Sequence, residues 1–144
     1  MSDTGRSAPP RITSVMLAQT VIQNAMTGNT SFIEIFNEIR LLQFPAAIAF
    51  HVVTLYDEFN QGGFEHHVRV LSPDGFTWET RMVVPSQPLP FLFIAAGPVA
   101  PLFSKEGELT VTILVDGKEG FVRRYPVQTI LSAQAPAASV EGNP

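Results

Sequence analysis

The sequence predicts an all-β protein, built as a single antiparallel β-sandwich of about seven to eight strands. Two segments alternate between apolar and polar residues on either side of turn sequences typical of β-hairpins. A third segment, residues 46–59, is apolar on both faces up to Thr54, as expected of a strand covered on both sides within the chain or by another subunit. The chain has 144 residues, of which 45% are hydrophobic and 15% charged, which suits one domain with a substantial core.

The clearest hairpin lies between residues 65 and 83. Its two halves, 65–72 and 76–83, flank Pro73-Asp74-Gly75, which predicts a type I turn followed by a glycine in the left-handed region. This loop sets the register, and the predicted pairs are Ser72–Phe76, Val70–Trp78, Val68–Thr80, His66–Met82 and Arg69–Glu79. We expect the Arg–Glu pair on the solvated side and the other pairs on the core side.

A second hairpin is predicted around Asp116-Gly117, a preferred type I′ dipeptide. With a two-residue turn, Val111 opposes Val122 on the inner face. That register sends a set of side chains outward, namely Phe121, Arg123 and Tyr125, beside Thr110 and Thr112. Aromatic rings flanking an arginine are typical of interface hot spots, and they also suit sugar stacking. These five residues are therefore the candidate interface, although a bulge at Gly120 would turn the same side chains inward.

Periodicity alone leaves the first third of the chain open. In residues 31–42 the apolar positions fit a helix, with Ser31 and Glu34 as a capping box, but they also line one face of a strand. Residues 15–26 suit a strand, and their β-branched side chains weigh against a strong helix. Residues 14–42 are therefore either two strands or a segment that includes a helix.

Several short motifs resemble a family of small bacterial β-sandwich domains of unknown function, over roughly residues 15 to 130. The motifs are Met16-Leu-Ala-Gln-Thr-Val-Ile, Thr30-Ser-Phe-Ile-Glu-Ile-Phe-Asn-Glu-Ile39, Phe44-Pro45, Pro73-Asp74-Gly75 and Asp116-Gly117. The resemblance implies a compact antiparallel sandwich with strands in the first third and a single helical turn at residues 36–40. It implies no catalytic or binding residues.

The residue types present exclude several chemistries. Without cysteine there is no disulfide, no thiolate nucleophile and no Cys-ligated metal. Of the three histidines, His51 is remote in sequence, and His66 and His67 are adjacent and so point to opposite faces of a strand. The sequence contains neither a Gly-x-Ser-x-Gly elbow nor a phosphate-binding loop. We therefore expect no catalytic residues, no metal site and no cofactor.

Charge and hydropathy also restrict the expected partners and location. The net charge of −4 provides no basic field for a nucleic acid. The start of the chain lacks a basic segment leading into an apolar run, so we expect no signal peptide and a cytoplasmic location. The most apolar stretch, residues 91–103, contains Pro98 and Pro101 and is too short to cross a bilayer. We therefore expect no membrane partner.

The organisation predicted from these patterns is a sandwich domain over residues 13–131, immunoglobulin-like or jelly-roll-like, between flexible tails at 1–12 and 132–144. Within it, residues 91–96 are expected to form a core strand and 98–103 to be exposed. The apolar strand surface exceeds what one small sandwich can hide. The sequence thus predicts a non-enzymatic structural or protein-interaction subunit, forming a homo-oligomer or binding another protein; the alternative is a module that binds carbohydrate or another small ligand.

Overall fold

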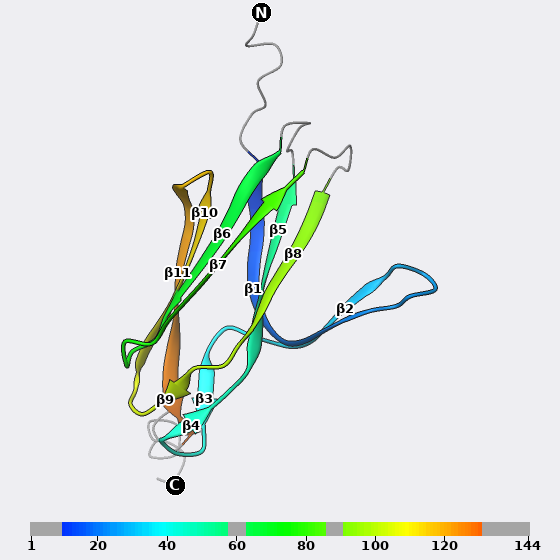
Figure 1. Cartoon of the computed structure of the whole chain (residues 1–144). Helices are drawn as coiled ribbons and strands as arrows, with labels where there is room; N and C mark the ends of the chain where they lie inside the picture. Colours follow the sequence, from blue (N-terminus) through cyan, green and yellow to red (C-terminus); the bar gives the residue numbers. More distant parts are fainter. Residues whose placement is uncertain (1–9, 58–62, 86–90, 131–144) are drawn as a thin grey trace, which may run out of the picture.

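Alternating and β-branched segments form strands along almost the whole described chain. The computed structural model describes residues 10–57, 63–85 and 91–130. Two sheets pack face to face, one with strand order β2-β1-β5-β8 and the other with order β3-β11-β10-β6-β7, and β4 pairs with β9 at one end (Figure 1). The strands are β1 (Arg11–Gln23), β2 (Thr30–Phe36), β3 (Ile39–Leu41), β4 (Ala46–Ala47), β5 (Phe50–Asp57), β6 (Phe64–Leu71), β7 (Thr77–Val84), β8 (Phe91–Val99), β9 (Leu102–Phe103), β10 (Gly107–Val115) and β11 (Lys118–Thr129).

The predicted all-β sandwich is therefore confirmed, with eight long strands and three short ones in the described ranges. All pairs are antiparallel except β11 with β3, which are parallel. No helix in the part of the chain that the structure describes is long and apolar enough to cross a membrane.

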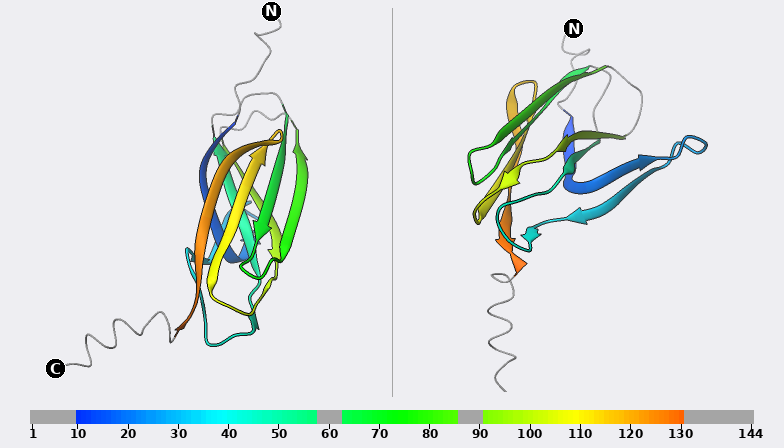
Figure 2. Two further views of the ribbon diagram at one scale, coloured as in Figure 1. Left: turned by 90° about the vertical axis from the view of Figure 1, so that its left-hand side faces the viewer. Right: turned by 60° about the horizontal axis from the view of Figure 1, so that its bottom comes forward.

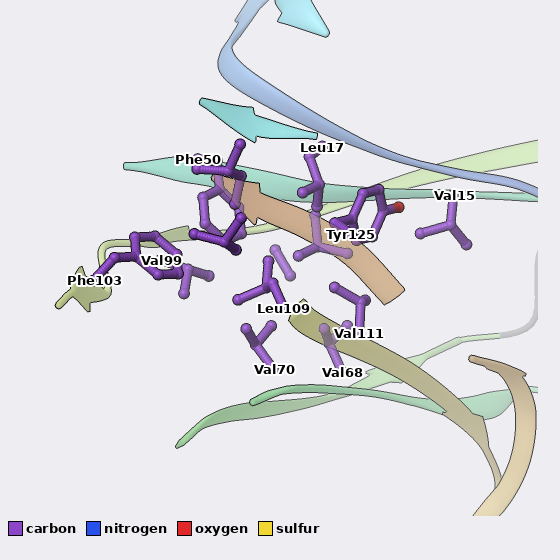
Figure 3. Close-up of a cluster of buried hydrophobic side chains, with 14 of the residues drawn as sticks. Val15, Leu17, Phe50, Val68, Val70, Val99, Phe103, Leu109, Val111 and Tyr125 are labelled. Atoms are coloured by element: carbon purple, nitrogen blue, oxygen red, sulfur yellow. The ribbon is translucent and has the colours of Figure 1, made fainter. Parts of the chain in front are cut away.

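Two groups of buried side chains fill the space between the sheets. The larger group draws on both layers and includes Leu17, Phe50, Val68, Leu109 and Tyr125 (Figure 3). The smaller group consists of Tyr56, Phe64, Val84 and Ile94. Burial of this apolar surface is the main favourable contribution to folding.

The β6–β7 hairpin has the register that its turn predicted. Val70 lies opposite Trp78, and Arg69 lies opposite Glu79. Gly75 has a φ of 88°, and the Ser72 amide donates a hydrogen bond to the Phe76 carbonyl oxygen at 2.9 Å. The turn chemistry was therefore sufficient to set this pairing.

The β10–β11 hairpin has the predicted type I′ turn but a different register. Asp116 and Gly117 both have positive φ, at 51° and 80°. The pairing shifts by one residue between Ile113 and Leu114, so that Leu114 opposes Glu119 while Ile113 opposes Phe121. Gly120 is thus the extra residue of a β-bulge, the alternative that the sequence had left open.

In the first third of the chain, the strand alternative is the one observed. Residues 11–23 and 30–36 are β1 and β2. The helical turn expected at 36–40 is wrong: the chain bends at Asn37 and Glu38, and Ile39–Leu41 then pairs with the end of β11. This pairing buries Ile39 and Leu41 in the core, which outweighs the weak local preference for a helix.

The strand expected to be covered on both sides is β5. It lies between β1 and β8, and its consecutive residues Val52, Val53 and Thr54 are all fully buried within one copy of the chain. It does not pair with β6, because the two strands belong to different sheets.

The structure differs from the predicted boundaries at the start of the domain and near residues 98–103. The first strand begins at Arg11, two residues before the expected start of the domain, and Ile12 packs against both core groups. The expected exposure of residues 98–103 is only partly observed, since Val99 and Phe103 are fully buried while Leu102 is exposed. Most of both predicted tails, residues 1–9 and 131–144, lies outside the described residues.

Substitutions at two glycines with positive φ, Gly75 and Gly97, can test how closely the backbone packs there. At Gly97, φ is 142° and an added Cβ would lie 3.0 Å from the Phe50 carbonyl oxygen, whereas at Gly75 an added Cβ would meet nothing within 4 Å. We expect Gly75→Ala to lower the free energy of unfolding by about 1 kcal/mol and Gly97→Ala by about 2 kcal/mol or more, because only the latter adds a backbone clash. Urea unfolding measures both, and Gly75→Asn is the control that should lose less. A Gly97→Ala protein as stable as wild type would contradict the close approach of Gly97 to the Phe50 carbonyl oxygen.

Candidate interaction surfaces

The second half of β1 and the whole of β2 form a hairpin that projects from the sandwich, and we call residues 19–36 the arm (Figures 1 and 2). Pairing of β1 with β5 ends at Ala18, whereas pairing with β2 continues to Gln23. The turn is closed by Asn24, whose side-chain Oδ1 accepts a hydrogen bond from the Met26 amide at 2.8 Å. The arm is therefore a two-stranded ribbon that carries its own turn.

The base of the arm is irregular. The β1–β2 register skips Gln19 and Glu34, and Glu34 has a φ of 57°, which is uncommon for a residue other than glycine. Nearer the tip, the Phe32 ring meets the Phe93 ring of β8 edge to face, with centroids 5.4 Å apart. This contact braces the arm against the edge of its own sandwich.

The arm exposes large apolar side chains and carries a single charged residue, Glu34 near its base. Four large side chains are accessible: Ile22 is 48% exposed, Met26 93%, Ile33 42% and Ile35 54%. Residues 13–33 contain no charged residue. β2 also ends its sheet, so one of its edges has no strand partner among the described residues. Natural edge strands are usually protected by charge, proline or a bulge away from the edge, and the tip of this arm has little such protection.

The outer face of the five-stranded sheet, unlike the arm, carries charged pairs. There Arg69 and Glu79 form an exposed pair 3.9 Å apart, as predicted, and Arg124 lies 3.9 Å from Glu108. Charged pairs of this kind are typical of a solvated surface. This face therefore mixes charged pairs with single exposed apolar side chains such as Val83 and Val122.

A groove lies between the edge strands β7 and β8, which end their respective sheets on the same side of the sandwich. Its volume is about 220 Å³, and its lining is wholly apolar: Met82, Val84, Pro85, Leu92, Phe93, Ile94 and Ala95. A second hollow of about 280 Å³ lies at the base of the arm, between Phe36, Ile48 and the Glu38–Arg40 ion pair. Both are smaller than the roughly 300–1,000 Å³ usual for small-molecule sites.

The register of β11 corrects the predicted interface. The outward orientation of Phe121, Arg123 and Tyr125 is wrong, because the bulge at Gly120 reverses the alternation of β11. Tyr125 is fully buried among the core side chains (Figure 3). Phe121 packs against the same cluster. Arg123 remains exposed at the edge, with its guanidinium carbon 4.8 Å from the centroid of the Tyr125 ring.

The two threonines lie on the other face of the sheet. Thr110 opposes Arg124 and Thr112 opposes Val122, so these two β11 residues share the outer face with them. Val122 is 41% exposed there. The five residues predicted as one interface are therefore divided between the two faces of the sheet.

The three histidines occupy separate places, and no group of three or more His, Asp or Glu side chains in the described ranges could hold a metal. His66 points into the core and His67 to the outer face, where its Nε2 lies 2.7 Å from Glu79 Oε1. The opposite directions of these neighbours were predicted correctly. The hydrogen bond with His67 is the main reason that the pKa of Glu79 is lowered, with Arg69 adding to it.

A polar pair is buried within the smaller core group. The Tyr56 hydroxyl lies 2.7 Å from His66 Nδ1, and both residues are fully buried. The two residues meet across the sandwich, because Tyr56 is on β5 and His66 is on β6 of the other sheet. Burial raises the pKa of Tyr56, so its hydroxyl keeps its proton. Burial, with a smaller effect from His67, lowers the pKa of His66 to about 4, so the ring is neutral.

Sequence reasoning missed the arm as a surface. The alternation in residues 15–26 was recognised as strand, but the long run without charge was not connected to exposure. That run was the available indication, since a solvated edge strand normally carries charge.

No family model matches the chain, and no curated protein matches it. One similar solved structure is an immunoglobulin-like protein from Pseudomonas aeruginosa, with 16% sequence identity and a TM-score of 0.43 over 83% of this chain and 97% of that one. The sandwich described above rests on the sheets and core of this chain itself.

The corrected register of β11 can be tested by two substitutions. We expect Tyr125→Ala to lower the free energy of unfolding by about 3 kcal/mol or more, because it removes a buried ring from the core. Arg123→Ala, two residues away and exposed, should cost less than about 1 kcal/mol. Chemical denaturation followed by circular dichroism measures both. Similar small losses of unfolding free energy in the two variants would indicate that the Tyr125 side chain points outward.

The buried histidine predicts a pH dependence of stability. Its folded pKa of about 4 lies below the unfolded value of about 6.5, so the unfolded state binds the proton more tightly. Stability from this group is complete above pH 6.5 and falls by about 3 kcal/mol as the pH drops to 4. Denaturation midpoints between pH 7 and 5 measure this, and His66→Gln should flatten the profile. An unchanged slope in that variant would assign the effect to other groups.

Proposed function

We propose that this protein is a non-enzymatic structural subunit that self-associates through its arm. The observation that carries the proposal is the projecting hairpin, which has four exposed large apolar side chains and no charge from Gln19 to Ile33. In an isolated copy this surface faces water, and its edge strand has unpaired backbone groups that can pair with another chain. A partner that covers the arm would bury the apolar side chains and pair the backbone groups of the edge strand.

The nature of the other surfaces also favours a protein partner. The hollows in the described structure are open and small for a substrate or cofactor, and the groove lining has no polar side chain that could orient a ligand. The carbohydrate alternative has weaker support, because the Tyr125 ring expected to form its stacking platform is buried.

Sedimentation of the purified chain tests the proposal. Wild type should show concentration-dependent association, and the double variant Ile33→Thr, Ile35→Thr should stay folded and monomeric. Threonine keeps the β-branched shape that suits a strand but removes apolar contact. Hot-spot side chains contribute about 2 kcal/mol each, so the double change should weaken association by roughly a hundredfold or more.

The matched control is Val83→Thr, which makes the same kind of change at a side chain that is 76% exposed on edge strand β7. It should associate like wild type. A wild-type chain that stays monomeric at concentrations of about 100 µM, or an arm variant that associates normally, would overturn the proposal.

A further inference from the structure

We infer that the arm of one copy binds the β7–β8 groove of another copy of this chain. The inference rests on the proposed function and specifies which surface receives the arm. Self-association is thereby a contact between two different surfaces.

The first support is backbone geometry. The groove is bounded by two edge strands, β7 from one sheet and β8 from the other, and neither has a second strand partner among the described residues. The arm presents β2, also an edge strand. Edge strands offer rows of unpaired donors and acceptors, and adding a strand to such an edge is a common mode of protein recognition.

The second support is the match in side-chain chemistry. The groove lining contains no charged or polar side chain, and the arm from its base to Ile33 contains no charge. Residues 19–33 of the arm would therefore pack against the groove without burying an unpaired charge, which costs several kcal/mol in an interface. The volume of about 220 Å³ accommodates one or two aliphatic side chains the size of Met26 or Ile33.

The third support is the position of the arm in its own copy. The arm contacts the groove lining of its own chain through Phe32 and Phe93, but its tip stands away from the body, where Met26 is 93% exposed (Figures 1 and 2). The Phe32–Phe93 contact braces it in this projecting position. An arm held in place before binding loses less conformational freedom when a second copy receives it.

The fourth support is area. The exposed parts of Ile22, Met26, Ile33 and Ile35 amount to roughly 450 Å² of apolar surface, and a specific interface needs about 600 Å² or more from each partner. The polar edge of the hairpin that would be covered with them supplies the remainder. A second copy is therefore a partner of suitable size.

Complementation between two defective variants tests the contact. The arm variant is Ile33→Lys, Ile35→Lys and the groove variant is Met82→Lys, Ala95→Lys; Val83→Lys is the groove control, on β7 but outside the groove. Each double variant alone should be monomeric or associate at least a hundredfold more weakly. An equimolar mixture should recover association in a one-to-one complex, because one intact arm meets one intact groove. Light scattering and sedimentation measure the masses.

The outcomes separate this inference from the proposed function. If wild type is monomeric, the proposed function fails. If only the arm variant is defective, or if both are defective and the mixture stays monomeric, the arm binds elsewhere and this inference is overturned while self-association stands.

A cross-linking pair covers the case in which a lysine in the groove unfolds the chain. The sequence has no cysteine, so Met26→Cys mixed with Ala95→Cys under oxidised glutathione reports one contact. We expect the mixed disulfide dimer to exceed either homodimer several-fold, and Met26→Cys mixed with Val83→Cys to show no such excess. Equal yields from the two mixtures would overturn the inference.

Discussion

The core depends on one extra residue at Gly120. The bulge there sets which side chains of β11 point inward, so that Phe121 opposes Ile113 and Tyr125 opposes Leu109 between the sheets. The same alternation carries on to Val127, beside which the short strand β3 pairs. Without the bulge, β11 would present Val122 and Arg124 to the core, and an uncompensated buried charge would oppose folding.

The two halves of β1 show how pairing decides between core and surface. Up to Ala18 the strand pairs with β5 in the body of the sandwich, and Val15 and Leu17 are buried. Beyond Ala18 only β2 remains as a partner, and side chains of the same apolar type are exposed on the arm. A two-stranded ribbon is marginal by itself, so the contact between Phe32 and Phe93 contributes to the stability of the arm.

The groove and the buried polar pair belong to one region of the molecule. Val84 and Ile94 line the groove and also pack in the core group that contains Tyr56. The hydrogen bond between Tyr56 and His66 keeps both polar groups in a wholly apolar setting, at the cost of sensitivity to acid. The stability of this end of the sandwich therefore underlies the shape of the proposed receiving surface.

The sequence by itself determined the fold class, the β6–β7 register and the type I′ turn at Asp116-Gly117. Each follows from local causes: strand alternation, and turn residues whose backbone preferences act over a few positions. Only the tertiary structure decided that β5 and β6 belong to different sheets and that Gly120 forms a bulge. It also decided that β1 extends past the end of its pairing with β5, which leaves an exposed arm. These depend on which strands meet, and the energy that selects them is burial summed over both sheets, so no local pattern of residues contains it.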